Sequence, residues 1–279
     1  MKYRISKITH QLIQLALGED LADIGDITSD SIFRNQKGSF YLESKQEGRL
    51  CGSTVFTYVF HMIDPSTEVK FLYSDGDTLT KGNIVAQVNG LIKNILKGER
   101  VALNFISHLS GISTKTTHFV SQVRNTTKIL DTRKTIPGLR ELQKYAVICG
   151  GGKNHRMGLY DMVLIKDNHI DKAGGVSSAV KKIREKVNHK VTIEVETRSL
   201  IEVREAIENK VDWIMLDNMS LTEMKEAVKI IDNKAKIEAS GNISLDNIAE
   251  VSKTGVDSIS VGELTHSVKA YDFSFKAKK

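Results

Sequence analysis

The sequence predicts an α/β protein with two domains, an N-terminal α+β sandwich domain and a TIM-like, partly open α/β barrel. The first hundred residues mix helical and strand patterns, whereas after residue 125 six short apolar runs alternate with amphipathic helical stretches. The starts of these runs are 34, 29, 22, 22 and 23 residues apart, the length of a strand, a helix and two short loops. Six βα units in succession favour a barrel over a flat sheet. The runs are KILD (128–131), MVLIKD (162–167), VTIEVE (191–196), WIMLDN (213–218), AKIEAS (235–240) and SISVG (258–262).

The elements of the first domain are expected in a less regular order. Residues 10–17 (HQLIQLAL) have helical apolar spacing and follow a cap at Thr9. Residues 25–33 (GDITSDSIF) and 39–52 (SFYLESKQEGRLCG) are typical of turns and short strands.

The remaining elements of this domain lead into a long helix. Residues 68–90 predict two strands around a turn at 75–77, and from Asn94 the pattern is helical, broken near Gly111 and resumed afterwards. We therefore place the N-terminal domain at residues 1–108 and the barrel at residues 109–268. We expect residues 269–279 to pack back on the first domain.

The composition is that of a folded protein with a mild positive balance. Apolar residues make up 40% of the chain and glycine accounts for 20 of 279 residues, which excludes disorder as the main state. The 40 Lys and Arg residues exceed the 34 Asp and Glu residues by six, but aromatic residues are only 6% of the chain and do not alternate with a basic run. Scattered surface lysines or a small anionic substrate explain this balance better than nucleic acid does.

The distribution of apolar residues and of cysteines indicates the location of the protein. We expect a soluble, cytoplasmic protein with no membrane partner, because no run of about 18 apolar residues occurs. Cys51 and Cys149 are the two cysteines, and they stand 98 positions apart. This spacing indicates neither a disulfide framework nor a zinc knuckle, and a reducing compartment is the default.

Each apolar run ends on a polar or small residue. In an α/β barrel the carboxyl ends of the strands meet at one face, where the active site is built. A single polar ending is explained by a strand that reaches solvent, but six endings of both charge signs favour a shared site. The endings are Asp131 to Lys134, Lys166 with Asp167, Glu194 with Glu196, Asp217 with Asn218, Ser240 with Gly241, and Gly262.

Cations are densest in residues 131–170, which predicts an anionic ligand. A guanidinium group binds a carboxylate or phosphate with two parallel hydrogen bonds, so Arg133 and Arg156 are the candidate ligands. His155 is expected to act as a hydrogen-bonding or anion-binding residue rather than as a metal ligand. The glycines at 150–152 have two interpretations, a helix C-cap with a turn or a close approach of ligand to the backbone.

The later strand ends predict a phosphorylated sugar. Carboxylates at Glu196 and Asp217 suit sugar hydroxyls, directly or through Mg²⁺, which usually combines one or two carboxylates with substrate phosphates. Barrels often bind phosphate at the loops after their final strands, where backbone N–H groups supply donors. The residues that suit this role are Ser240, Gly241, Gly262 and His266.

The run DTRKTIPGLRELQKYAVICGGGKNHRMGLYDMVLIKDNHI (131–170) resembles the signature of the quinolinate phosphoribosyltransferases. Supporting matches occur in family order along nearly the whole chain: GDITSDSIF, ERVALNFISHLSGIST, IEVET, IMLDNM, EASGNI and TGVDSISVGELTHS. Three sites, four residues in all, depart from the family's usual sequence. Ile148-Cys149 stand where an arginine is frequent, Gln143 replaces a glutamate, and Gly98 replaces an alanine.

The resemblance implies an enzyme that transfers phosphoribose from phosphoribosyl pyrophosphate to the ring nitrogen of quinolinate. Loss of CO2 and pyrophosphate leaves nicotinate mononucleotide, and the expected cofactor is Mg²⁺. The implied assembly is a homodimer, or a higher oligomer of dimers, in which Arg100 enters the partner's site. The implied quinolinate ligands are Arg100, Arg133, Lys134, His155 and Arg156. The implied catalytic residues are Lys134, Lys166, Glu196 and Asp217, and the implied phosphoribosyl pyrophosphate ligands are Lys166, Glu196, Asp217, Ser240, Gly241, Gly262 and His266.

Three alternatives stay open at this point. A relative of the same fold is associated with molybdenum transport, but the GGGKNHR and IKDNH stretches expected to differ in it stand intact here. Lys166 at a strand end also suits the Schiff-base lysine of a barrel aldolase. A protein that binds nucleic acid without catalysis is the third alternative, marked by steep salt dependence and no turnover.

Overall fold

The computed structural model describes residues 3–124, 126–187 and 190–278. The chain divides into two compact units. Unit 1 contains residues 1–117, 135–151 and 264–279, and unit 2 contains residues 118–134 and 152–263. Among the described residues, no helix combines the length and the apolar character needed to cross a membrane.

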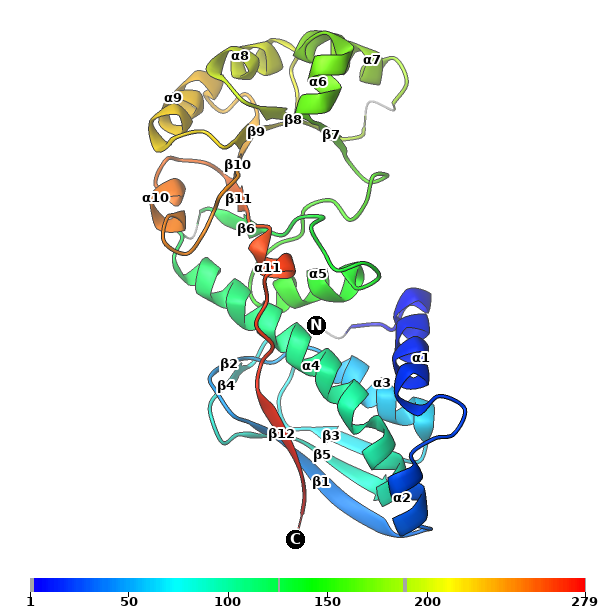
Figure 1. Cartoon of the computed structure of the whole chain (residues 1–279). Coiled ribbons are helices and arrows are strands. Elements are labelled where there is room, and N and C mark those ends of the chain that lie inside the picture. Colours follow the sequence, from blue (N-terminus) through cyan, green and yellow to red (C-terminus); the bar gives the residue numbers. More distant parts are fainter. Residues whose placement is uncertain (1–2, 125, 188–189, 279) are drawn as a thin grey trace. The chain divides into compact units, whose positions relative to one another are not determined.

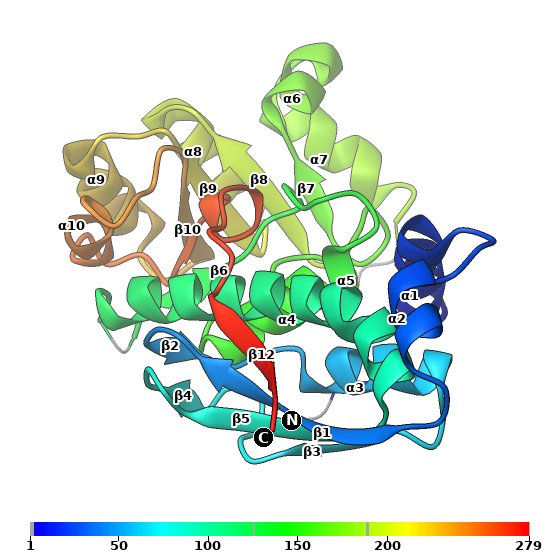
Figure 2. The ribbon, with the colours of Figure 1, turned by 60° about the horizontal axis from the view of Figure 1, so that its bottom comes forward.

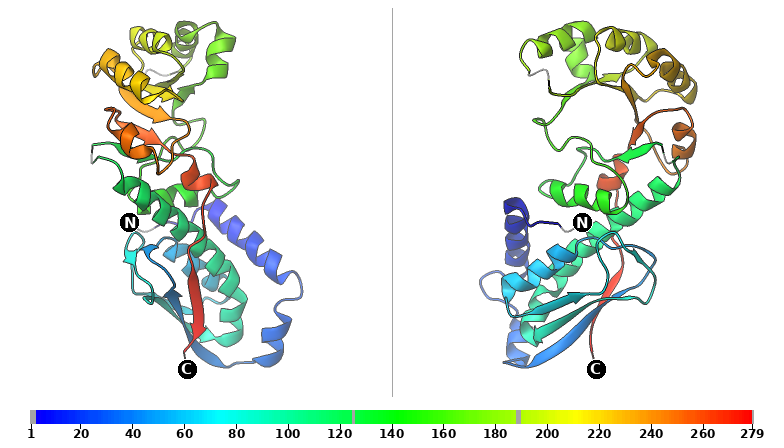
Figure 3. Two further views of the ribbon diagram at one scale, coloured as in Figure 1. Left: turned by 60° about the vertical axis from the view of Figure 1, so that its left-hand side comes forward. Right: turned by 180° about the vertical axis from the view of Figure 1, so that it is seen from behind.

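Unit 2 contains a six-stranded parallel sheet in the order β6-β11-β10-β9-β8-β7. All six predicted strands are present: β6 (Lys128–Leu130), β7 (Val163–Ile165), β8 (Ile193–Thr197), β9 (Trp213–Asp217), β10 (Lys236–Ser240) and β11 (Ser258–Ser260). Figures 1 and 3 show these strands as an arc with the helices on its outer side. No described ladder joins β6 to β7, which confirms the partly open barrel.

Helices follow the strands of unit 2 as the spacing predicts. They are α6 (Asp167–Ala173), α7 (Val176–Arg184), α8 (Leu200–Glu208), α9 (Leu221–Ile231) and α10 (Ile248–Ser252). Each strand is apolar on the face that the helices cover, as with Val195 on β8 and Ile214 on β9, which are both fully buried. Burial of such side chains stabilises the sheet by about 1.5–3 kcal/mol per residue.

Unit 1 contains a mixed α+β layer whose sheet has the order β12-β1-β5-β3, with a two-stranded ribbon β2-β4 beside it. The strands are β1 (Lys37–Ser44), β2 (Gly48–Arg49), β3 (Glu68–Phe71), β4 (Thr78–Leu79), β5 (Ile84–Leu91) and β12 (Phe273–Ala277). The helices are α1 (Lys7–Leu21), α2 (Ile27–Ile32), α3 (Ser53–Ile63), α4 (Ile92–Ser121), which runs on into unit 2, α5 (Arg140–Cys149) and α11 (Glu263–His266). Figure 2 shows α3 and α4 on one side of the sheet.

Strand β12 forms an edge of this sheet and pairs antiparallel with β1, from Phe40↔Ala277 to Ser44↔Phe273. Its Phe275 ring contacts Phe40, with ring centroids 5.4 Å apart, and lies 6.1 Å from the Phe60 ring of α3. The end of the chain thus completes both the sheet and the aromatic core of unit 1.

Two helix starts differ from the prediction. Helix α1 begins at Lys7 and is capped by Ser6, whose Oγ accepts the Thr9 N–H at 3.1 Å, so Thr9 is in the first turn rather than at the cap. Residues 27–32 form helix α2 instead of a turn or strand. Asp26 caps it by accepting the N–H groups of Thr28 and Ser29 at 3.0 Å each. Hydrogen bonds from Ser29 lower the pKa of Asp26, which keeps this cap ionised.

Helix α4 runs without interruption through Gly111, where the sequence predicts a break. A Cβ at this position would collide with the carbonyl oxygen of Lys269, so the glycine allows the C-terminal segment to lie directly against the helix. The turn at 75–77 also differs from the predicted hairpin. Strand β3 before it pairs with β5, whereas β4 after it pairs with β2.

Candidate active site

The carboxyl ends of the six strands of unit 2 and the residues that directly follow them form the candidate site, here called the rim. The parallel register places Ser240 beside Asp217, and Glu196 beside Met215 on the same face as Asp217. Side chains that are far apart in the sequence therefore lie at adjacent positions around one edge of the sheet. The strand register thus agrees with the sequence prediction that the strand ends share one face.

Lys166 and Glu196 form the ion pair of the rim. The Nζ of Lys166, which follows β7, lies 2.9 Å from Oε2 of Glu196 on β8. The Glu196 side chain is 10% exposed and the Lys166 side chain 47% exposed, so the cation faces solvent while the carboxylate lies deeper. The Lys166 N–H also donates to Nδ1 of His169 at 3.0 Å, which orients the start of α6.

The edge between β9 and β10 has a strained, closely approached backbone. Asn218 has φ +55° and Gly241 has φ +93°. A Cβ at Gly241 would collide with the Asn218 side chain, whose Nδ2 donates to Oδ2 of Asp217 at 2.9 Å. Gly241 is thus required by its conformation and by the approach of Asn218. Ser240, partly exposed at the end of β10, accepts the Asn218 N–H at its carbonyl oxygen at 2.9 Å.

Two guanidinium groups, Arg133 and Arg156, form the arginine pair of unit 2. Residue 153 bridges to Leu130 of β6, which brings the segment before Arg156 alongside the strand before Arg133. Burial and the neighbouring charge of Arg133 lower the pKa of Arg156. The Nε of Arg133 is buried and has no hydrogen-bond partner among the described residues. Two like charges held this close together predict an anionic ligand between or above them.

His155 lies beneath the rim in what we call the interior cluster, with Glu194 of β8 and Glu238 of β10. Its Nε2 is 2.9 Å from Oε2 of Glu194 and 3.6 Å from Oε2 of Glu238. Its Nδ1 accepts the Arg156 N–H at 2.8 Å, so the hydrogen bonds assign the ring proton to Nε2, which donates to Glu194. The backbone N–H of His155 donates to Oδ1 of Asp131 at 2.9 Å.

The interior carboxyl groups are poised to hold protons near neutral pH. Burial raises the pKa of Glu194 to about 7, although the charge of Arg156 opposes this shift. Burial and the neighbouring Glu194 raise the pKa of Glu238 to about 8. Both side chains are 1% exposed. Sequence analysis missed Glu238 because it lies inside a strand, two residues before the polar ending that marked β10.

The other predicted site residues have different surroundings. Lys134 is exposed after β6, and Gly262 is partly exposed after β11, both in unit 2. Arg100 and His266 belong to unit 1. The Arg100 side chain is 74% exposed on α4 and lies 4.0 Å from Glu99, and His266 is exposed at the end of α11. Within unit 2 the structure places Arg156 beside Arg133 and His155, Lys166 beside Glu196, and Asp217 beside Ser240.

Gln143, which departs from the family pattern, and Gly150 both have a packing role in unit 1. The Oε1 of Gln143 accepts the Ile136 N–H at 2.9 Å, and its Nε2 donates to the Thr265 carbonyl oxygen at 3.2 Å and contacts Nε2 of His108 at 2.8 Å. Burial lowers the pKa of His108, so the neutral ring accepts from the amide. The glycine at 150 ends α5, and a Cβ there would collide with the Ser113 carbonyl oxygen. Of the two interpretations of the glycines, the helix cap applies at this position.

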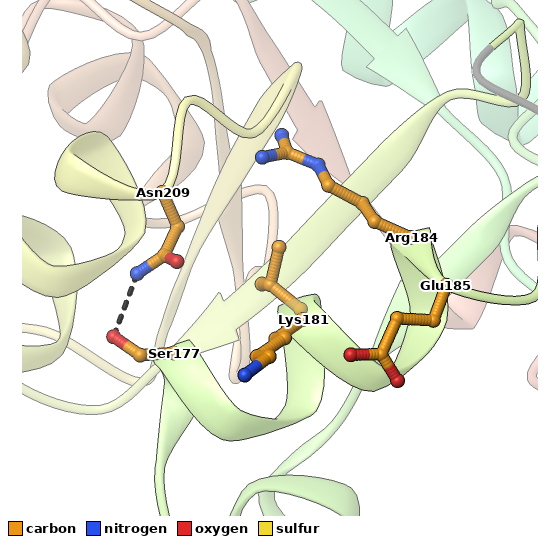
Figure 4. Close-up of a pocket in the computed structure, with 6 residues that line it drawn as sticks. Ser177, Lys181, Arg184, Glu185 and Asn209 are labelled. Atoms are coloured by element: carbon orange, nitrogen blue, oxygen red, sulfur yellow. Dashed lines mark hydrogen bonds between the residues drawn. The ribbon is translucent and has the colours of Figure 1, made fainter.

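A separate pocket of about 470 Å³ lies on the helical side of unit 2 (Figure 4). Its lining residues come from α7 and from Asn209 at the end of α8, whose Nδ2 donates to Ser177 Oγ at 2.7 Å. None of the predicted site residues lines this pocket, and we assign no part of the rim to it.

Comparison with known proteins identifies relatives across the chain. The family model of the quinolinate phosphoribosyl transferase N-terminal domain matches residues 26–110, and that of the C-terminal domain matches residues 112–276. Quinolinate phosphoribosyltransferase (decarboxylating) 2a, mitochondrial, from Nicotiana tabacum is 42% identical over 284 residues, covering 95% of this chain and 81% of that protein. The probable nicotinate-nucleotide pyrophosphorylase (carboxylating) of Bacillus subtilis is 44% identical over 257 residues, covering 91% and 89%. The solved structure of the nicotinate-nucleotide pyrophosphorylase from Francisella tularensis superposes with a TM-score of 0.93 at 40% identity, covering 99% and 98%.

Proposed function

The chain belongs to the quinolinate phosphoribosyltransferase family, and we propose that its rim and arginine pair carry out this family's reaction. The enzyme is a nicotinate-nucleotide pyrophosphorylase (carboxylating) of NAD biosynthesis. It joins the ring nitrogen of quinolinate to the anomeric carbon of phosphoribosyl pyrophosphate. The C–O bond to pyrophosphate breaks, the carboxylate next to the ring nitrogen leaves as CO2, and nicotinate mononucleotide remains.

The arginine pair carries the proposal for quinolinate. A dicarboxylate loses water when it binds, and its two charges must be met by fixed cations. Arg133 and Arg156 supply two guanidinium forks; burial and then the charge of Arg133 lower the pKa of Arg156, and a bound dianion would offset both effects. The exposed Lys134, which directly follows Arg133, is a third cation in the same loop. His155 fixes the Arg156 backbone through its Nδ1 and thereby positions this pair.

The Lys166–Glu196 pair and Asp217 support the proposal for phosphoribosyl pyrophosphate. Their carboxylates suit the ribose hydroxyls, while the exposed Lys166 Nζ suits a phosphate. Ser240 and Gly241 offer a hydroxyl and a backbone N–H to the phosphate groups. Gly262 and His266 stay predictions for this role.

Magnesium fits the donor atoms of the rim. Glu196 and Asp217 lie on neighbouring strands and on the same face, and they offer the carboxylate oxygens that Mg²⁺ prefers. When bound with the substrate, Mg²⁺ would neutralise charge on the departing pyrophosphate. We propose these two residues as its protein ligands, directly or through water.

Catalysis in this arrangement consists mainly of positioning and electrostatics. The arginine pair holds the pyridine ring with its nitrogen towards the sugar, and Glu196 and Asp217 stabilise the positive charge that develops on the ribose. Ribosylation makes the ring nitrogen cationic, so the ring itself accepts the electron pair left by CO2 before a proton replaces it. No protein nucleophile takes part. The Lys166 Nζ lies 2.9 Å from Oε2 of Glu196, and we assign this pair to the sugar phosphate rather than to Schiff-base chemistry.

The assembly and location are further parts of the proposal. The exposed side chain of Arg100 on α4 suits a contribution to the quinolinate site of a second subunit in a homodimer. Coexpression of Arg100→Ala and Arg133→Ala subunits tests it, because some mixed dimers would hold one complete site. No regained activity despite subunit exchange would count against this role of Arg100. We keep the cytoplasm as the proposed location.

One assay tests the reaction. Purified protein is incubated with quinolinate, phosphoribosyl pyrophosphate and Mg²⁺, and we expect nicotinate mononucleotide and pyrophosphate in equal amounts. The Glu196→Gln/Asp217→Asn double variant is the inactive comparison, and Asp257→Asn at the opposite end of the sheet is the matched control. Absence of product from folded wild-type protein would refute the activity. Full activity in the double variant would refute the roles of the two carboxylates alone.

A further inference from the structure

The two cysteines of the chain, far apart in the sequence, lie together in unit 1. One donor atom each from Cys51, Asp75 and Cys149 can be chosen so that all three lie within 4.8 Å of one another. Cys51 lies between β2 and α3, Asp75 in the turn before β4, and Cys149 at the end of α5. This thiol cluster shares no residue with the rim or the interior cluster, and its existence does not depend on the proposed function.

The backbone and the carboxylate of the thiol cluster are held by hydrogen bonds. The Cys51 N–H donates to Ser110 Oγ at 2.9 Å, and Ser110 Oγ donates back to the Cys51 carbonyl oxygen at 3.1 Å. Asp75 accepts the Ser53 N–H on Oδ1 at 3.0 Å and the Tyr145 hydroxyl on Oδ2 at 2.8 Å. Tyr145 lies one turn before Cys149 on α5, so the same helix supplies a sulfur donor and the group that orients the carboxylate.

The donor set of the thiol cluster, two sulfurs and a carboxylate, is one that suits a divalent cation. Thiolate sulfur and carboxylate oxygen are both ligands of zinc, and three potentially anionic donors together offset the charge of a divalent cation.

The spacing and exposure also suit a cation. Two sulfurs bound to a tetrahedral zinc ion at about 2.3 Å lie roughly 3.8 Å apart, so donors within 4.8 Å need to move only about 0.5 Å each. Cys51 is fully buried, whereas Cys149 and Asp75 are partly exposed, which leaves an approach from their side. A hydroxyl donor on the carboxylate ligand is the kind of outer contact that orients metal ligands.

We propose that Cys51, Cys149 and Asp75 bind a thiophilic divalent cation of the zinc class, with a fourth position left to water. Binding releases the thiol protons and joins the end of α5 to the segment before α3 and to the turn at 75–77. The site is a structural clamp of unit 1, separate from the Mg²⁺ proposed at the rim.

Cobalt provides the test, because thiolate-to-cobalt charge transfer is visible in the near ultraviolet. Reduced, metal-free protein is titrated with Co²⁺ and then with Zn²⁺. We expect one Co²⁺ per chain with this absorption, its displacement by Zn²⁺, and a Tm several degrees higher with bound Zn²⁺. Cys51→Ser and Cys149→Ser each abolish the absorption. Asp75→Asn weakens binding at least tenfold, and Asp77→Asn in the same turn is the matched control with unchanged binding.

Two further controls separate the proposed sites. The Glu196→Gln/Asp217→Asn variant retains the cobalt absorption even where phosphoribosyl transfer is lost, so failure of either proposal is distinguishable. Circular dichroism establishes that each serine variant is folded. Absence of the absorption from reduced wild-type protein with two titratable thiols overturns the proposal, and so does an absorption that survives both serine substitutions.

Discussion

Glu194 and Glu196 occupy the same strand, β8, two residues apart and on the same face, yet their environments are opposite. Glu196 at the rim pairs with the Lys166 ammonium at 2.9 Å. Glu194, one layer deeper, shares His155 with Glu238, and burial raises its pKa to about 7. A difference of one pleat repeat therefore separates a carboxylate paired with a lysine from a buried one whose pKa is raised.

Charged groups at the rim and in the interior cluster therefore affect the protein in different ways. A charge at the rim meets its partner in a ligand or in a mobile side chain, so its removal affects binding more than folding. An interior carboxyl group has no solvent to stabilise its charge, so its protonation is coupled to folding. Mutations at the rim should therefore mainly lower activity, whereas mutations of the interior carboxyl groups should mainly change stability.

The largest expected effect is at the arginine pair. Arg156→Ala removes a guanidinium fork and should lower kcat/KM for quinolinate by about 100- to 1000-fold, equal to about 3–4 kcal/mol. Steady-state kinetics and thermal unfolding measure the two properties, and we expect a Tm within a few degrees of wild type. Arg184→Ala, in the pocket of Figure 4, is the arginine control with unchanged kinetics. An unfolded or fully active Arg156 variant would contradict the assignment.

The Glu238→Gln variant of the interior cluster should show the reverse behaviour, a change in stability. The folded pKa of Glu238, about 8, lies above its ordinary value of 4.5. The stability that this group contributes is therefore complete below pH 4.5 and is lost as the pH rises through 8, with a slope of at most about 1.4 kcal/mol per pH unit. The glutamine variant cannot ionise, so at pH 8.5 it should exceed wild type in stability by on the order of 2 kcal/mol.

Urea unfolding at pH 5, 7 and 8.5 measures this difference. Glu194→Gln is the matched variant, and we expect it to flatten the pH dependence at lower pH because the Glu194 pKa is about 7. If wild type and Glu238→Gln lose stability in parallel between pH 5 and 8.5, the buried carboxyl group is not the cause.

The smallest stability effect is expected for Lys166→Met. The lysine side chain is 47% exposed, so its ion pair contributes less than about 1 kcal/mol to the free energy of unfolding. We nevertheless expect at least a tenfold loss of kcat/KM for phosphoribosyl pyrophosphate. Lys236→Met is the matched control, because it breaks an ion pair of the same 2.9 Å length with Asp257 away from the rim. Equal kinetic losses in the two variants would show that the rim position has no special role.

The barrel strands were predictable because each is an apolar run that ends at a polar or small residue. A parallel strand buried on both faces is a short apolar run, and its carboxyl end is marked by a charged residue such as Lys166 or Asp217. Glu238 was not predictable in the same way. A glutamate inside an apolar run is ordinarily a surface residue, and its interior neighbour His155 comes from a remote segment of the chain.

Unit 1 was predicted less well because its elements depend on partners far away in the chain. Asp26 is followed by a segment rich in serine and threonine, and this pattern suits a turn as well as the cap of α2. Gly111 reads as a helix break until the Lys269 backbone lies against it. The thiol cluster is of the same kind, since nothing near Cys51 in the sequence indicates Cys149.

The pairing of β12 with β1 has a consequence for biosynthesis. Residues 37–44 leave the ribosome early and can pair with β5 soon afterwards, but their other edge has no partner until residues 273–277 have been translated. Tyr271, whose ring is buried beside Gly48 and whose hydroxyl contacts Ser44 at 2.7 Å, is made equally late. All of the barrel is translated while that strand edge is exposed, so the nascent polypeptide is most open to wrong intermolecular pairing during this interval.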